Sequence, residues 1–256
     1  MKLIARALLV LVAAWPLPAL GGVLIVEKTT GTDSPQTHRI QIDRDWMRME
    51  HGMSGEKHVF LFDGLKETVW IVNADRKTYT EMTKADVDRL GAQMSEAVAK
   101  LQETLKNVPP QHRAMMEAML KGQGAGGTVQ RTVYRKAGTD MVGPWTCDKY
   151  DGYLNDQKTS ELCTVDPAAL GFVPADFEVS RKLAEFFKKL VPQNADNLFS
   201  LGKPEEQGFA GVPVRRVFYV GRRQTVTETV ELSRQAFPPS TWEIPPGLTK
   251  KAWGER

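Results

Sequence analysis

The chain has 256 residues, of which 41% are hydrophobic and 25% are charged, and its formal net charge is +3. The first 21 residues hold two of the 34 Lys and Arg and none of the 31 Asp and Glu, so the remainder carries a net charge of +1. A chain so close to neutral has no electrostatic reason to bind nucleic acid or an anionic membrane surface, and it is long enough for a sizeable core.

Residues 1–21 have the pattern of a secretory signal peptide. Lys2 and Arg6 supply a basic start, an apolar run follows at 8–14, and small residues at Ala19 and Gly21 precede a cut that leaves Gly22 first. The apolar run is about half the length needed to span a bilayer. We therefore expect an exported, soluble, periplasmic protein that is not an integral membrane protein.

The next part of the chain has the composition of short strands. The segments 23–29, 37–42, 46–51, 57–62, 68–72 and 77–82 are rich in apolar and β-branched residues and are separated by Gly, Asn and Asp. Short strands at spacings near ten residues, broken by such turn residues, predict an antiparallel meander.

The periodicity then changes to that of a helix. Thr83 and Asp86 have the spacing of a capping box, and apolar residues follow at steps of three and four for about 25 residues, up to Pro109. A second short helix is expected before the glycine stretch at 122–127. The two helices together form a predicted helical insertion, residues 83–121.

Strands are predicted again at 128–136, 212–220 and 225–232. A third helix is expected after Pro174, and the tail 236–256 is expected to be an extended arm with an edge strand at 241–244. Strands, two helices, strands, helix and strands form an α+β order. Residues 22–256 are therefore expected to be one domain, a curved antiparallel sheet with helices packed on its concave face.

Cys147 and Cys163 are the two cysteines of the chain. An even pair in an oxidising compartment is most simply a disulfide. Residues 154–157 have the composition of a hairpin turn, and a hairpin centred on Asn155 would place the two cysteines directly opposite each other. A separation of sixteen residues does not match a CxxC redox or metal motif. We therefore predict a structural disulfide.

Four residues spaced by two, Met47, Met49, His51 and Met53, point to one face if their segment is a strand. Thioether and imidazole ligands suit Cu(I), so the pattern is a candidate metal site. The alternative is that the same face is simply the apolar lining of the sheet, because Met is an adaptable core residue.

Methionines are frequent in the predicted helical insertion, and Met-rich surfaces accept varied apolar partners. An apolar ligand between helices and sheet is therefore one candidate function, with core packing as the alternative. The candidate lining residues are Met94, Leu101, Met115, Met119, Phe186 and Phe187.

Enzyme signatures are weak. The four histidines, His38, His51, His58 and His112, are not part of a hydrolase motif, G-x-S-x-G does not occur, and the glycine stretch at 122–127 lacks the Lys-Ser/Thr of a phosphate-binding loop. We expect a protein that is not an enzyme and uses no cofactor.

Several stretches resemble a family of proteobacterial periplasmic proteins known only as a domain of unknown function. The matching stretches are 69–82, 145–153, 163–167, 184–187, 208–216 and 240–248. Strand order and the Pro-Gly ending are also distantly similar to the LolA and LolB lipoprotein carriers. That resemblance implies an unclosed antiparallel half-barrel, with helices covering an apolar cavity, and it implies no catalytic residues.

Two functional hypotheses follow. The first is an exported binding protein that holds a lipid or acyl chain between sheet and helices. The second is an envelope protein-interaction module in which residues 83–121 dock a protein partner.

Overall fold

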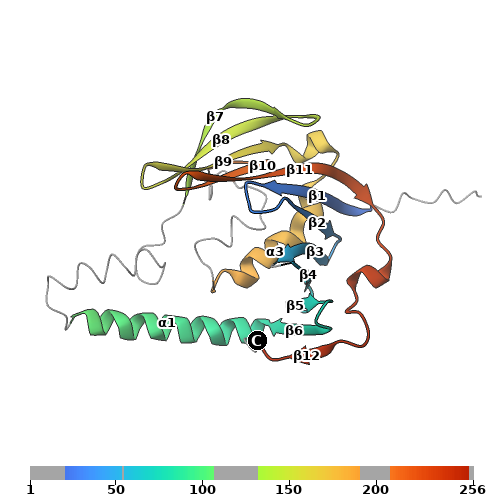
Figure 1. Ribbon diagram of the computed structural model, residues 1–256, viewed down its shortest axis with the longest axis vertical. Helices are drawn as coiled ribbons and strands as arrows, with labels where there is room; N and C mark the ends of the chain where they lie inside the picture. Colours follow the sequence, from blue (N-terminus) through green and yellow to red (C-terminus); the bar gives the residue numbers. More distant parts are fainter. Residues whose placement is uncertain (1–20, 54, 107–131, 191–207, 254–256) are drawn as a thin grey trace, which may run out of the picture.

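The computed structural model describes residues 21–53, 55–106, 132–190 and 208–253, and these are dominated by strands (Figure 1). The strands are β1 Gly22–Thr30, β2 Gln36–Ile42, β3 Trp46–Met53, β4 Glu56–Asp63, β5 Thr68–Asn73, β6 Thr78–Thr83, β7 Val133–Val142, β8 Trp145–Leu154, β9 Gln157–Val165, β10 Val212–Val220, β11 Arg223–Gln235 and β12 Thr249–Lys251. The helices are α1 Lys84–Lys106 and α3 Glu178–Phe187, with short 3-10 turns at Pro167–Leu170, Pro174–Phe177 and Pro239–Trp242.

All twelve strands belong to one sheet, in the order β12-β6-β5-β4-β3-β2-β1-β11-β10-β9-β8-β7. Neighbouring strands are antiparallel except β12, which pairs in parallel with β6. The sheet curls and stays open, so that β7–β9 and β5, β6 and β12 lie on opposite sides of α3 (Figure 1).

The predicted fold class, an α+β half-barrel like LolA with helices packed on the concave face, is wrong. The chain forms one large mixed sheet, and the described part contains two α-helices. The longest helix, α1, leaves the end of β6 and runs beyond the sheet (Figure 1). Of its residues, Val87 and the partly buried Leu90 join the main core, and Leu105 in its last turn is also buried.

The start of α1 follows the sequence prediction. The Thr83 N–H donates to Asp86 Oδ2 at 3.0 Å, and the Asp86 N–H donates to Thr83 Oγ1 at 3.3 Å. This is a capping box with Asp in place of Glu, and it satisfies two donors that a helix start leaves unpaired. The predicted second helix and the glycine stretch lie outside the described residues.

The C-terminal arm packs on the outer face of the sheet at β3, where its Trp242 meets Trp46. Trp242 stacks on Trp46 with ring centroids 6.2 Å apart, and Trp46 stacks on Trp70 at 6.3 Å. The predicted edge strand at 241–244 is wrong, because Trp242 ends a 3-10 turn and the strand forms later, at β12. The Thr249 N–H donates to the Lys77 carbonyl at 2.9 Å, where the arm returns to the sheet beside β6.

Candidate functional site

On β1–β6, the inner face of the sheet carries three transverse rows of side chains, because directly opposite residues on paired strands share a face. The first row is Val23, Ile42, Met47, Phe62, Val69 and Met82. The second row is Ile25, Ile40, Met49, Phe60, Ile71 and Thr80. The third row is Glu27, His38, His51, His58, Asn73 and Thr78.

Burial decreases from the first row to the second. Every first-row residue is at most 3% exposed, and Phe62 is fully buried. The second row is apolar apart from Thr80, and all of its residues are only half-buried. All residues of the third row are polar. The inner face therefore runs from a closed core to a polar margin across a partly covered apolar band.

Helix α3 explains this gradient. Phe186 packs on Phe62 of the first row, with ring centroids 5.6 Å apart, and Phe187 lies over Phe60 of the second row at 6.2 Å. Consecutive residues at the end of the helix thus reach consecutive rows. Because α3 ends at Phe187, the helix covers the first row more completely than the second.

The third row brings three histidines together. His51 and His58 are directly opposite on β3 and β4, and their rings stack with centroids 5.8 Å apart. On β2 and β3 the last paired residues are Arg39 and Glu50. His38 and His51 are the next residues on these two strands, so the register brings them side by side. Burial lowers the pKa of His51 below 6.5, and the charges that His58 and His38 can carry lower it further. The arrangement therefore favours the neutral form of His51.

Acidic residues next to the histidines are already paired. Glu27 accepts a hydrogen bond from Arg216 at 2.6 Å. Glu56, two residues before His58, accepts from Arg76 at 2.8 Å and from Asn73 at 2.6 Å. Hydrogen bonds from Arg76 and then Asn73 lower the pKa of the Glu56 carboxyl, so this group is ionised at neutral pH.

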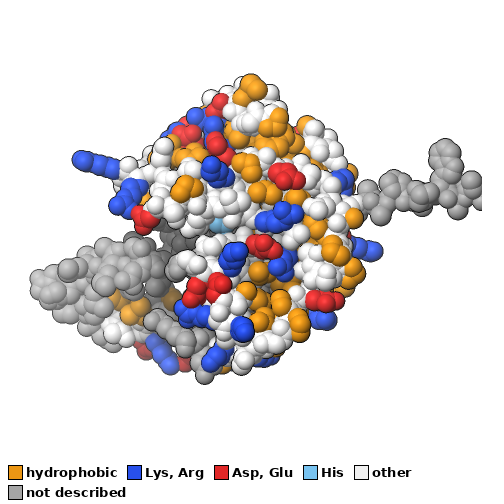
Figure 2. All heavy atoms as spheres, turned by 45° about the vertical axis from the view of Figure 1, so that its right-hand side comes forward, with side chains coloured by type: hydrophobic (Ala, Val, Ile, Leu, Met, Phe, Trp, Pro, Cys, Tyr) orange, Lys and Arg blue, Asp and Glu red, His pale blue; other side chains and the backbone are white. Residues whose placement is uncertain are grey.

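A pocket opens where the second and third rows meet β6 and β12. Its volume is about 220 Å³. The lining residues are His58, Ile71, Asn73, Arg76, Thr78, Thr80 and Lys251. Figure 2 shows a histidine side chain near the centre of the face that it presents, with both signs of charge interspersed around it. The pocket lining therefore combines one apolar side chain, Ile71, with polar and cationic residues.

The methionines and histidine of the predicted metal site are divided between rows. Met47 is in the closed core, where the Ser180 hydroxyl lies 3.8 Å from its sulfur. Met49 is in the half-buried second row and His51 is in the third. The side chain of Met53 is not among those that the structure describes. Among the described residues, no group of three or more His, Cys, Asp or Glu is placed to hold a metal ion.

The predicted apolar-ligand residues are also spread over the molecule. Phe186 is buried and Phe187 half-buried against the inner face, whereas Met94 on α1 is 50% exposed and Leu101 is half-buried further along that helix. Met115 and Met119 lie outside the described residues. Of this set, the two phenylalanines are the ones that the structure places at the inner face.

Sequence reasoning missed the pocket residues. His58 has a signal in the sequence, because it lies two residues before Phe60 and four before Phe62 and therefore shares their face in a strand. Asn73 and Arg76 carry no comparable signal, since they reach the pocket through the register of β5 against β4 and the turn after β5.

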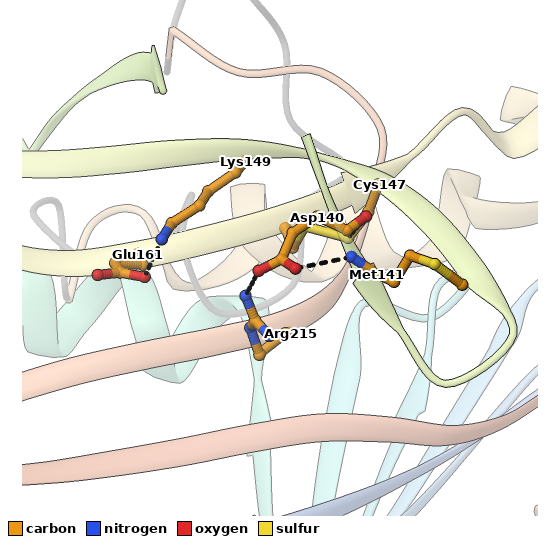
Figure 3. Close-up of a disulfide and its surroundings, with 7 residues drawn as sticks. Asp140, Met141, Cys147, Lys149, Glu161 and Arg215 are labelled. Atoms are coloured by element: carbon orange, nitrogen blue, oxygen red, sulfur yellow. Dashed lines mark hydrogen bonds and ion pairs between the residues drawn. A yellow bond between two sulfur atoms is a disulfide. The ribbon is translucent and has the colours of Figure 1, made fainter. Parts of the chain in front are cut away.

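The predicted disulfide is confirmed. Cys147 and Cys163 are bonded, with Cα atoms 5.4 Å apart. Close by, Asp140 on β7 faces Arg215 on β10 and accepts a hydrogen bond from it, and Lys149 points to Glu161 at 3.1 Å (Figure 3). These pairs connect the strands of this part of the sheet, so the structure indicates a stabilising role for the region.

Glu161 is the strongest ionic centre near the disulfide. Burial opposes its ionisation, but hydrogen bonds from Lys158, Tyr219 and Lys149 outweigh burial and lower its pKa to about 2. The Lys158 ammonium is 2.7 Å from the Glu161 carboxylate, and the Tyr219 hydroxyl donates to it at 2.7 Å.

No protein-family model and no curated protein matches this chain. Among solved structures it is similar to an uncharacterized conserved protein from Thermus thermophilus, with 10% sequence identity, a TM-score of 0.48 and 91% of each chain covered. In the described residues, no helix is both long and apolar enough to cross a membrane.

Proposed function

We propose that this protein is a non-enzymatic binding protein that holds an apolar ligand, such as a lipid or an acyl chain, on the second row of its inner face. One observation carries the proposal. The apolar second row is only half-buried and borders a pocket of about 220 Å³, while the first row beside it is closed. A contiguous apolar surface left partly uncovered is typical of a binding site.

The second row offers a suitable surface for a chain. Ile71, Phe60 and Met49 are on three neighbouring strands, and Phe187 of α3 lies over the middle one. A ligand chain placed across these strands would remove their exposed apolar area from water, which contributes roughly 25 cal/mol per Å² buried.

Export to the periplasm is part of the proposal. It is supported by the signal-like residues 1–21 and by the disulfide, because disulfides persist in oxidising compartments. The bond also occupies both cysteines of the chain, which leaves no thiol nucleophile.

Native mass spectrometry and a neutral apolar dye test the proposal. Protein purified without detergent should retain a ligand that organic solvent extracts, and the delipidated protein should bind 1-N-phenylnaphthylamine. The variant Ile71→Gln, which places an amide between the second row and the pocket, should bind the dye at least several-fold more weakly. An apo mass alone, together with no dye binding, would refute the proposal.

Val59→Gln is the matched control. Val59 is adjacent to Phe60 on β4, is also half-buried, and points to the opposite face of the sheet. The same chemical change there should leave dye binding unchanged. Equal losses in both variants would mean that destabilisation, and not the inner face, explains the effect.

A second candidate, an envelope protein-interaction module, is favoured by one observation. Met94 is 50% exposed on α1, the helix that runs beyond the sheet (Figure 1). Met94→Glu should then weaken a partner identified by cross-linking without changing dye binding. An unchanged partner list would count against this role.

A further inference from the structure

The pocket beside the second row contains an unsatisfied polar atom. The Nδ1 atom of His58 is buried and has no hydrogen-bond partner, and His58 lines the pocket. The Nδ1 atom of His51, whose ring stacks on His58, is in the same condition. Buried polar atoms are nearly always hydrogen-bonded in folded proteins, so His58, a lining residue of the pocket, has hydrogen-bonding capacity that the described residues do not use.

The charges around the pocket favour an anion. Arg76 and Lys251 line the pocket. Glu56 offsets one of them, because it accepts hydrogen bonds from Arg76 and Asn73 and lies 3.7 Å from His58 Nε2. Lys251 makes no ion pair within the described residues, so one positive charge at the pocket is uncompensated.

Apolar and polar walls meet in the pocket in a fixed order. Ile71 belongs to the second row and is directly opposite Phe60, while Asn73 belongs to the third row and is directly opposite His58. A molecule that fills the pocket therefore has its apolar part toward Ile71 and its polar part toward His58. Neighbouring strands are about 4.8 Å apart, so a chain can continue from Ile71 across Phe60 to Met49.

We infer that this pocket takes the singly charged acidic head group of an amphiphile, with a fatty-acid carboxylate as the fitting class. The carboxylate accepts a hydrogen bond from the His58 imidazole, whose ring turns toward the pocket on binding, and it is neutralised by Lys251. The chain lies along the second row. This inference rests on the proposed function, because it names the head group of the ligand whose chain the second row holds.

The test compares two amphiphiles of equal chain length, decanoate and decanol, by calorimetric titration of the delipidated protein. Wild-type protein should bind decanoate more tightly. His58→Gln should weaken decanoate binding about tenfold, as expected for a lost hydrogen bond to a charged group, and should leave decanol binding unchanged. Lys251→Gln, an exposed position that does not endanger folding, should weaken decanoate binding several-fold in the same selective way.

His38→Gln is the matched control, because His38 belongs to the third row but does not line the pocket. Decanoate should bind this variant as it binds the wild type. Acetate and inorganic phosphate test the alternative of a free-anion site, and both should bind far more weakly than decanoate.

The outcomes separate the two claims. If neither decanoate nor decanol binds, the proposed function fails and the head-group assignment fails with it. If both bind equally and His58→Gln changes nothing, the second row still holds a chain but the acidic head group is refuted. If acetate or phosphate binds as tightly as decanoate, the pocket is a free-anion site and the amphiphile assignment is overturned.

Discussion

Cys163 lies directly opposite Lys149, so its disulfide to Cys147 crosses diagonally between β8 and β9. A turn centred on Asn155 would have placed the cysteines directly opposite each other. The turn instead contains two residues, Asn155 and Asp156, both with positive φ. The pairing of β8 with β9 then shifts register between Gly152 and Tyr153. Two-residue turns of this kind match the twist of paired strands. The Cα atoms remain within disulfide reach at 5.4 Å.

Replacing both cysteines by Ala should lower the free energy of unfolding by about 3 kcal/mol, because the bond closes a loop of some sixteen residues in the unfolded chain. Urea denaturation measures this loss. A reductant should bring the wild type to the value of the variant and should not affect the variant itself. Two titratable thiols per chain in the unfolded, unreduced protein would contradict the bond.

Phe186→Ala and Phe187→Ala should separate stability from binding. Phe186 is 5% exposed and packs on the fully buried Phe62, so its truncation should cost about 3–5 kcal/mol. Phe187 is half-buried over the second row, and its truncation should cost about 1–2 kcal/mol while weakening dye binding several-fold. Urea denaturation and dye titration give the two readouts. A Phe187 variant with unaltered dye affinity would argue against ligand contact at the second row.

Stability should depend on the protonation of His51. Its pKa is lowered from 6.5 by burial and by His58 and His38, so the unfolded chain takes up the proton more readily than the folded protein. This group therefore contributes stability above pH 6.5 that is lost as the pH falls through the folded pKa. Unfolding free energies at pH 7.5 and 5.5 should differ less in His51→Gln than in the wild type. An identical difference in both proteins would exclude His51 as the cause.

Glu161 should govern stability in a more acidic range. Its folded pKa of about 2 lies below the ordinary 4.5, so its contribution is present above pH 4.5 and is lost as the pH falls toward 2. Glu161→Gln should cost about 2 kcal/mol at pH 7, since Lys149 and Lys158 lose their charged partner. The cost should be smaller at pH 3 and should vanish toward pH 2, where the wild-type carboxylate itself becomes protonated. The exposed Glu103→Gln serves as the control and should change stability little at either pH.

The C-terminal arm should contribute through its tryptophan. Trp242→Ala removes the ring stacked on Trp46 and should lower the free energy of unfolding by about 2 kcal/mol. Trp253→Ala is the matched control, because Trp253 is 47% exposed and should cost less than about 0.5 kcal/mol. Equal effects of the two substitutions would mean that the arm does not hold the outer face through Trp242.

Local features of this protein could be predicted from the sequence. The capping box of Thr83 and Asp86 depends on residues three apart, and the shared face of Met47, Met49 and His51 depends on the two-residue period of a strand. The disulfide partner was determined as well, because the chain has two cysteines. In each case the interaction is settled within a few residues or by the absence of an alternative partner.

Tertiary structure decided the rest. The backbone hydrogen bonds that join strands are the same for every sequence, so the number of strands in the sheet and the parallel return of β12 have no local signal. The pocket depends on register. His58 and Asn73 are fifteen residues apart and meet because β4 and β5 pair where their apolar faces match. A shift of one residue between the two strands would put these side chains on opposite faces. The sequence thus determined which residues share a strand face, and the packing of distant strands decided which of those faces meet at a site.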